Sequence, residues 1–81
     1  MKFENQTILI TGGAQGIGFA LSKKFSVMGA NVVIADIHKD TPNIAKNFGG
    51  FGYICDVTQE EELNNFITFA EDRLGGVHCF I

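Results

Sequence analysis

The stretch "ILITGGAQGIGFAL", residues 8 to 21, decides how the rest of the chain is interpreted. Three apolar residues lead into a threonine, and four glycines then fall within seven positions before apolar residues resume. An ordered glycine costs about 0.5 to 1 kcal/mol relative to alanine in a helix or strand. A cluster this dense therefore indicates a strand, a tight turn that excludes β-carbons, and a helix in succession.

Short apolar runs recur along the chain at regular intervals. They cover residues 6–11, 31–36, 51–56 and 77–81, and they are rich in β-branched residues. Near-continuous apolar runs of this kind are typical of strands buried on both faces of a parallel sheet. We therefore expect four parallel, central strands.

The segments between these runs carry helix signals. The first has an apolar stripe at helical spacing, interrupted by one lysine and stopped by Gly29; it consists of Ile17, Ala20, Leu21, Lys24, Phe25 and Met28. In the second, Thr41 is predicted as the N-cap with Pro42 at the first helical position, and Gly49-Gly50 predicts the end of the helix. In the third, Thr58 and Glu61 form a capping-box pattern ahead of an apolar stripe, and Gly75-Gly76 predicts the helix end.

This βαβαβαβ order predicts an open α/β sheet, either flavodoxin-like or of the mononucleotide-binding type. The glycine turn favours the second, a Rossmann-type sheet. In a dinucleotide-binding unit the first turn must be tight, approach a pyrophosphate and pack against the following helix. We assign these demands to Gly12, Gly16 and Gly18, and we expect Gly13 to tolerate substitution best. A Walker-type loop is excluded because no Gly-Lys-Ser/Thr follows.

Two acidic residues follow later strands. Asp36 ends the second apolar run, where a carboxylate can accept hydrogen bonds from the hydroxyls of an adenosine ribose. The same charge repels a 2'-phosphate, and neither Gln15 nor Ile37 is basic, so NAD is favoured over NADP. Asp56 ends the third run and could accept a bond from an adenine amino group, with the Val57 N–H facing a ring nitrogen. Without the glycine turn, Asp36 would be interpreted as a solvated aspartate at a strand end. The alternative for Asp56 is that it merely precedes a helix start.

These residues resemble the cofactor-binding segment of the short-chain dehydrogenases/reductases. "TGGAQGIG" is similar to that family's Thr-Gly-x-x-x-Gly-x-Gly loop, and Asp36 and "CDVT" match its further cofactor contacts over essentially the whole chain. The resemblance implies a nicotinamide dinucleotide cofactor and hydride transfer between an alcohol and a carbonyl. The candidate cofactor-binding residues are Thr11, Gly12, Gln15, Gly16, Ile17, Gly18, Asp36, Asp56 and Val57.

The chain departs from the family at its end. The family's Asn-Ala-Gly segment, its serine and its Tyr-x-x-x-Lys pair have no counterpart, because Tyr53 is the sole tyrosine and Val57 stands four positions later. We therefore expect one NAD(P)-binding segment, residues 1–81, that resembles the first third of the family's domain, has no catalytic residues and is inactive alone. Right-handed crossovers predict the strand order 3-2-1-4, with an uncovered sheet edge that favours self-association.

Composition limits the partners. The 81 residues carry a net charge of -3, which gives no basic footprint for nucleic acid. No apolar run approaches the ~20 residues that span a bilayer, and the polar start "MKFENQ" lacks a secretory core, so we expect a cytoplasmic protein. Cys55 and Cys79 match no zinc pattern, and the strand order would separate them by about 14 Å, too far for a disulfide.

Two other functions remain open. Methyltransferases that use S-adenosylmethionine also combine a glycine-rich turn with acids after the second and third strands. Their ligand lacks the pyrophosphate that suits glycines at a helix start. The third hypothesis is a module without enzymatic activity, either a nucleotide sensor or an inert truncated fragment.

Overall fold

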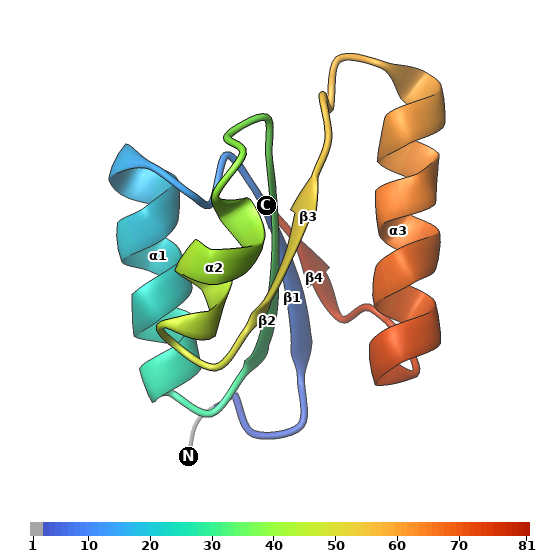
Figure 1. Ribbon diagram of the computed structural model, residues 1–81. Coiled ribbons are helices and arrows are strands. Elements are labelled where there is room, and N and C mark those ends of the chain that lie inside the picture. Colours follow the sequence, from blue (N-terminus) through green and yellow to red (C-terminus); the bar gives the residue numbers. More distant parts are fainter. Residues whose placement is uncertain (1–2) are drawn as a thin grey trace.

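A four-stranded parallel sheet lies between two layers of helices (Figure 1). The computed structural model describes residues 3–81. In chain order, its elements are β1 (Thr7–Thr11), α1 (Gly16–Val27), β2 (Asn31–Asp36), α2 (Thr41–Lys46), β3 (Phe51–Ile54), α3 (Glu60–Leu74) and β4 (Cys79–Phe80). The strand order is β3-β2-β1-β4, and each neighbouring pair is parallel. The predicted Rossmann-type α/β fold is confirmed.

The sheet separates two apolar cores. β1 and β2 pair in register from Thr7 with Asn31 to Thr11 with Ala35. Alternate residues of these strands point to opposite faces, so one face is apolar toward α1 and α2 and the other toward α3. The first core centres on Ile8, Ile10, Val32 and Ile34, and the second on Leu9, Val33, Ala35 and Phe66.

The helices cover the faces as predicted. Figure 1 shows α1 and α2 together on one side of the sheet and α3 alone on the other. The Ser26 hydroxyl of α1 donates to the Phe48 carbonyl after α2, 2.5 Å away, and ties the two helices together. Phe3 and Phe25 pack edge to face, with ring centroids 5.3 Å apart, beneath the same core.

The predicted apolar stripe of α1 is wrong in phase. Ile17 is 82% exposed, and Ala20 and Lys24 are exposed as well, whereas Leu21 and Phe25 pack against the core and Ser22 is fully buried. The first half of α1 is apolar on every side, so spacing alone could not fix its orientation. The small residues Gly18 and Ser22 fix it instead, because they allow the helix to approach the glycine turn.

Both predicted helix caps are also wrong. α2 is preceded by Asp40, and the Thr41 hydroxyl donates to the His38 carbonyl from inside the first turn. α3 is preceded by Gln59, without a side-chain cap, and the Thr58 hydroxyl bonds to Asp56 rather than to the helix. In each case a nearer acceptor in the preceding turn takes the hydroxyl. Gly75 ends α3 in a left-handed conformation, as the sequence indicates.

The outer strands are less buried than predicted. β3 and β4 form the sheet edges, and Phe51, Ile54 and Phe80 are exposed. β4 is held by His78, whose backbone N–H donates to the Thr7 carbonyl while its Nδ1 accepts from the Thr7 N–H at 2.9 Å.

Both cysteines are free thiols, Cys55 buried directly after β3 and Cys79 exposed on β4. Within residues 3–81, no helix is long and apolar enough to cross a membrane.

Candidate functional site

The loops that follow β1, β2 and β3 meet at one end of the sheet (Figure 1). There the chain forms a hollow of about 160 Å³, lined by Gly12, Ala35, Asp36, Ile37, Cys55, Asp56 and Val57. Gly12, Asp36, Asp56 and Val57 were predicted from the sequence as cofactor-binding residues, and the structure brings them together. The other five candidates lie on β1 and on the turn and first helical residues that follow it.

Gly12 and Gly16 adopt backbone conformations that favour glycine. Their φ angles are +68° and +53°, in the left-handed region that side chains with a β-carbon avoid. A β-carbon at either position would meet no atom within 4 Å. The turn is thus open on its outer side, which leaves room for a ligand to approach the backbone closely.

Gly18 and Gly13 are required for a different reason, which is close packing. A β-carbon on Gly18 would strike the Gly12 carbonyl, with its carbon 2.7 Å away, so α1 presses on the glycine turn itself. A β-carbon on Gly13 would lie 2.5 Å from Cβ of Ile34 on β2. The prediction that Gly13 tolerates substitution best is therefore wrong. Sequence reasoning missed this because the contact partner lies 21 positions away, on another strand.

The amino ends of α1 and α3 differ in charge. Gln15 precedes the helix without a side-chain cap, and the first turn contains no acidic residue. By contrast, α3 begins with Glu60, Glu61 and Glu62. The first backbone N–H groups of a helix need acceptors, and they carry a partial positive charge. This helix start is suited to an anion.

Asp36 joins the glycine turn to the turn after β2. Its Oδ2 accepts from the Ala14 N–H at 3.2 Å, and its Oδ1 accepts from the His38 N–H at 3.1 Å. The neighbouring Ala35 carbonyl accepts from the Gly12 N–H at 2.7 Å. Backbone N–H groups of Ala14 and His38 thus fix the Asp36 carboxylate beside the hollow.

Asp56 is held by the turn that leads into α3. One carboxylate oxygen, Oδ1, accepts from the Thr58 hydroxyl at 2.6 Å and from the Thr58 N–H at 3.0 Å. These bonds, the hydroxyl first, lower the pKa of Asp56 below its usual value. Among the described residues, Oδ2 has no hydrogen-bond partner, so Asp56 keeps one ionised acceptor for a ligand.

Three residues of the hollow were not predicted as site residues: Ala35, Ile37 and Cys55. The Cys55 thiol lies among carboxylates. Burial raises its pKa above the usual value, and the charges of Glu62, Asp56 and Asp36 raise it further. Cys55 therefore presents a neutral thiol to the hollow. Its place directly before Asp56 is the signal that could have identified it.

The other predicted residues have varied surroundings. Thr11 ends β1 and donates both its N–H and its hydroxyl to the Ile81 carbonyl, at 2.9 and 3.2 Å. Gln15 and Ile17 are exposed beside the start of α1. Neither side chain packs against the sheet, so both are accessible to a ligand.

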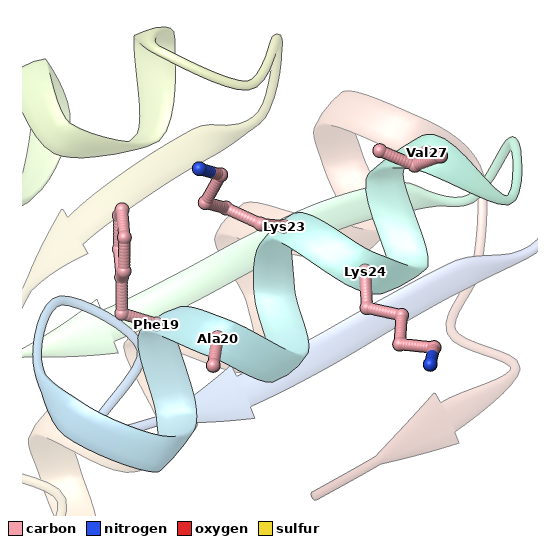
Figure 2. Close-up of a pocket in the computed structure, with 5 residues that line it drawn as sticks. All are labelled: Phe19, Ala20, Lys23, Lys24 and Val27. Carbon is pink, nitrogen blue, oxygen red and sulfur yellow. The ribbon is translucent and has the colours of Figure 1, made fainter.

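A second hollow, of about 490 Å³, lies on the outer side of α1 (Figure 2). It is lined by Phe19, Ala20, Lys23, Lys24 and Val27, and Figure 2 shows the two lysines extending to different sides of the helix. Lys23 Nζ stands 5.6 Å from the centre of the Phe19 ring. Its lining has no acidic group or hydroxyl, so it offers no acid–base pair.

The strand order and the helix layers together define a Rossmann-type α/β protein. A sequence model described as short chain dehydrogenase matches residues 6–81. The chain belongs to the short-chain dehydrogenase family, a family of oxidoreductases.

Curated relatives and a solved structure agree with this assignment. An uncharacterized oxidoreductase of Mycobacterium bovis is 37% identical over 81 residues, covering 94% of this chain and 33% of the relative. The 7alpha-hydroxysteroid dehydrogenase of Escherichia coli is 33% identical over 87 residues, covering 100% of this chain and 34% of the relative. A crystal structure of hydroxysteroid dehydrogenase from Escherichia coli superposes with a TM-score of 0.89 at 34% identity, over 98% of this chain and 35% of that one. The chain thus spans about a third of the length of these proteins.

Proposed function

We propose that this chain is the NAD-binding segment of a short-chain dehydrogenase, and that the hollow beside Asp36 and Asp56 receives the adenosine half of the cofactor. One observation carries the proposal. Gly12, Asp36 and Asp56 line the same hollow, next to a helix start that has no side-chain cap and no acidic residue. An adenosine joined to a pyrophosphate fits that combination of groups.

Each part of the site has a separate task. The open turn at Gly12 and Gly16 admits the pyrophosphate, and the first N–H groups of α1 donate hydrogen bonds to it. Asp36 accepts from the ribose hydroxyls, and Asp56 Oδ2 accepts from the adenine amino group. When bound, the nicotinamide ring supplies or accepts a hydride in the family's reaction, the interconversion of an alcohol and a carbonyl compound.

Charge at the hollow favours NAD over NADP. The carboxylate of Asp36 would repel a 2'-phosphate on the ribose. None of the lining residues is basic, and the side chain next to Asp36 is the apolar Ile37. Binding of NADPH should therefore be much weaker than binding of NADH.

We do not expect these 81 residues to catalyse hydride transfer on their own. Tyr53 is the single tyrosine, and it packs between strand and helix, with its ring 5.0 Å from Phe69 and 6.0 Å from Phe66. Tyr53 is not among the residues that line the hollow. We expect binding without turnover.

Calorimetry tests this function. NADH, NADPH and S-adenosylmethionine are titrated into the chain and into the variant Asp36→Asn, with Asp72→Asn as a control that removes an exposed acid from α3. We expect NADH to bind best and D36N to weaken it by about tenfold or more, because a charge-assisted hydrogen bond is lost. D72N should bind like the unchanged chain. Preferential binding of S-adenosylmethionine would favour a methyltransferase segment, and a folded chain that binds none of the three would be an inert fragment.

We also propose that the chain self-associates through the β4 edge. Among residues 3–81, β4 pairs with β1 alone, and Phe80 and the adjacent Ile81 are 45% and 43% exposed. An uncovered apolar strand edge is a template for pairing with another chain. Sedimentation velocity should show a concentration-dependent dimer that Phe80→Lys weakens, and a monomer at all concentrations would refute it. The cytoplasmic location stays a prediction from the sequence.

A further inference from the structure

We infer that Glu62 is a positioning residue, which fixes the segment of residues 55–58 and through Asp56 sets the preference of the hollow for adenine. The inference rests on the proposed function, because it assigns a specificity to the same hollow. It concerns a residue of α3 that does not line the hollow.

The contact that carries the inference joins a side chain of α3 to the backbone of the hollow. Oε1 of Glu62 accepts a hydrogen bond from the Asp56 N–H at 2.9 Å. β3 has ended at Ile54, and the last bond to β2 runs from the Cys55 N–H to the Asp36 carbonyl at 3.0 Å. Asp56 follows this last bond to the sheet, and its N–H is received by Glu62 instead.

The remaining bonds of Asp56 leave one direction open. The Gln59 N–H donates to its carbonyl at 3.0 Å, and Thr58 occupies Oδ1 with two bonds. With the N–H taken by Glu62, the backbone and half of the carboxylate are fixed. Oδ2 is then the single acceptor left for a ligand. Loss of the Glu62 bond would free the backbone that aims this oxygen.

The neighbours of Glu62 show that its hydrogen bond to Asp56 is separate from the general role of acidic residues at a helix start. Glu60, Glu61 and Glu62 all stand in the first turn of α3, where acidic residues interact favourably with the helix dipole. Glu60 and Glu61 are exposed, whereas Glu62 is half-buried and makes the contact to Asp56. The chain thus contains its own control residues, with the same charge at the same helix end.

The local charge also indicates what the hollow selects here. With Asp36 and Asp56, this end of the hollow is negative and lacks a basic side chain. Such an environment favours a neutral group that donates hydrogen bonds, such as the amino group of adenine, over a group that only accepts them.

The experiment compares two cofactors that differ at that amino group. Calorimetry measures the dissociation constants of NADH and of reduced nicotinamide hypoxanthine dinucleotide, in which a carbonyl oxygen replaces the amino group. The unchanged chain should prefer NADH by about tenfold or more. Glu62→Gln keeps an acceptor oxygen and should keep the preference, as should the control Glu61→Ala.

Two variants should lose the preference. Glu62→Ala removes the acceptor, and Glu62→Asp keeps the charge but shortens the side chain so that it falls short of the Asp56 N–H. We expect both to bring the two dissociation constants to within about twofold of each other. E62D retains an acidic residue at the helix start, so it decides the question if E62A does not fold. In E62D, but not in E62Q, the Asp56 amide should also exchange its hydrogen faster.

The outcomes separate the two proposals. If E62A and E62D weaken both dinucleotides equally, Glu62 has a structural role alone and the inference is wrong. An Asp56 amide exchange rate that E62D leaves unchanged would also contradict it. If the unchanged chain binds neither dinucleotide, the proposed function itself is refuted, and the inference with it.

Discussion

Replacing Gly13 with alanine should destabilise the fold, although alanine is the smallest change possible. The added β-carbon would lie 2.5 Å from Cβ of Ile34 and 3.2 Å from the Ser22 hydroxyl. Ile34 is fully buried in β2 and stiff at its branched β-carbon, and Ser22 is bonded to the Gly18 carbonyl at 2.7 Å. Neither neighbour can move without shifting a strand or a helix.

The expected magnitude follows from two opposing effects. Forcing one extra carbon into a packed core costs about 1–3 kcal/mol. Alanine restricts the unfolded chain more than glycine and returns about 0.4–1 kcal/mol. The net loss is about 1–2 kcal/mol, and a domain of this size loses roughly 4–8 °C in Tm per kcal/mol.

Thermal unfolding followed by circular dichroism measures this loss. The matched control is Gly49→Asn, at a glycine with φ +75° and open space around it, where asparagine tolerates the left-handed conformation. G49N should change stability by less than about 0.5 kcal/mol. A G13A variant that melts at or above the Tm of the unchanged chain would refute the packing argument.

Three further predictions concern single hydrogen-bonding groups. Thr58→Val removes the hydroxyl bonded to Asp56, so the pKa of Asp56 should rise toward its usual value, whereas Thr58→Ser should keep it lowered. Because the pKa of Asp56 is lower in the folded state, these bonds contribute fully to stability above the ordinary pKa of aspartate, and their contribution is lost as the pH falls through the folded-state pKa. A carboxyl titration by NMR that gives equal pKa values for Asp56 in T58V and T58S would contradict this. Thr7→Val replaces a buried hydroxyl that has no hydrogen-bond partner within residues 3–81, so it should raise the free energy of unfolding, measured by urea titration, by about 1 kcal/mol. A lower free energy of unfolding in T7V would mean that the hydroxyl does have a partner. His78→Ala removes the acceptor of the Thr7 N–H, so it should lower the free energy of unfolding by about 0.5–1.5 kcal/mol and speed exchange of the Thr7 amide. His78→Asn should recover part of this loss, and an unchanged exchange rate in H78A would be incompatible with the hydrogen bond between Thr7 and His78.

Strand order, parallel pairing and helix placement could be predicted from the sequence, because they follow from apolar runs, their spacing and the handedness of crossovers. The positions of Asp36 and Asp56 at one edge follow from the same logic, since parallel strands end together. Local patterns set these features, and no distant side chain was needed to place them.

The errors arose where a distant contact overrides a local pattern. Gly13 was interpreted as dispensable because nothing near it in the sequence needs its space, yet Ile34 does. The face of α1 was assigned from apolar spacing, whereas Gly18 and Ser22 determine it by allowing close approach. Thr41 and Thr58 have the composition of helix caps, but each hydroxyl finds an acceptor in the preceding turn. Glu62 could not be distinguished from Glu60 and Glu61 until its bond to Asp56 was seen.

The central claim is that the hollow between the ends of β1, β2 and β3 binds the adenosine half of NAD. A titration of the isotope-labelled chain with NADH, followed by amide NMR, tests it most directly. We expect saturable shifts at Gly12, Gly16, Asp36 and Asp56, with the outer side of α1 at Lys23 and Val27 unaffected. Shifts confined to the outer side of α1, or no shifts in a folded sample, would contradict the claim.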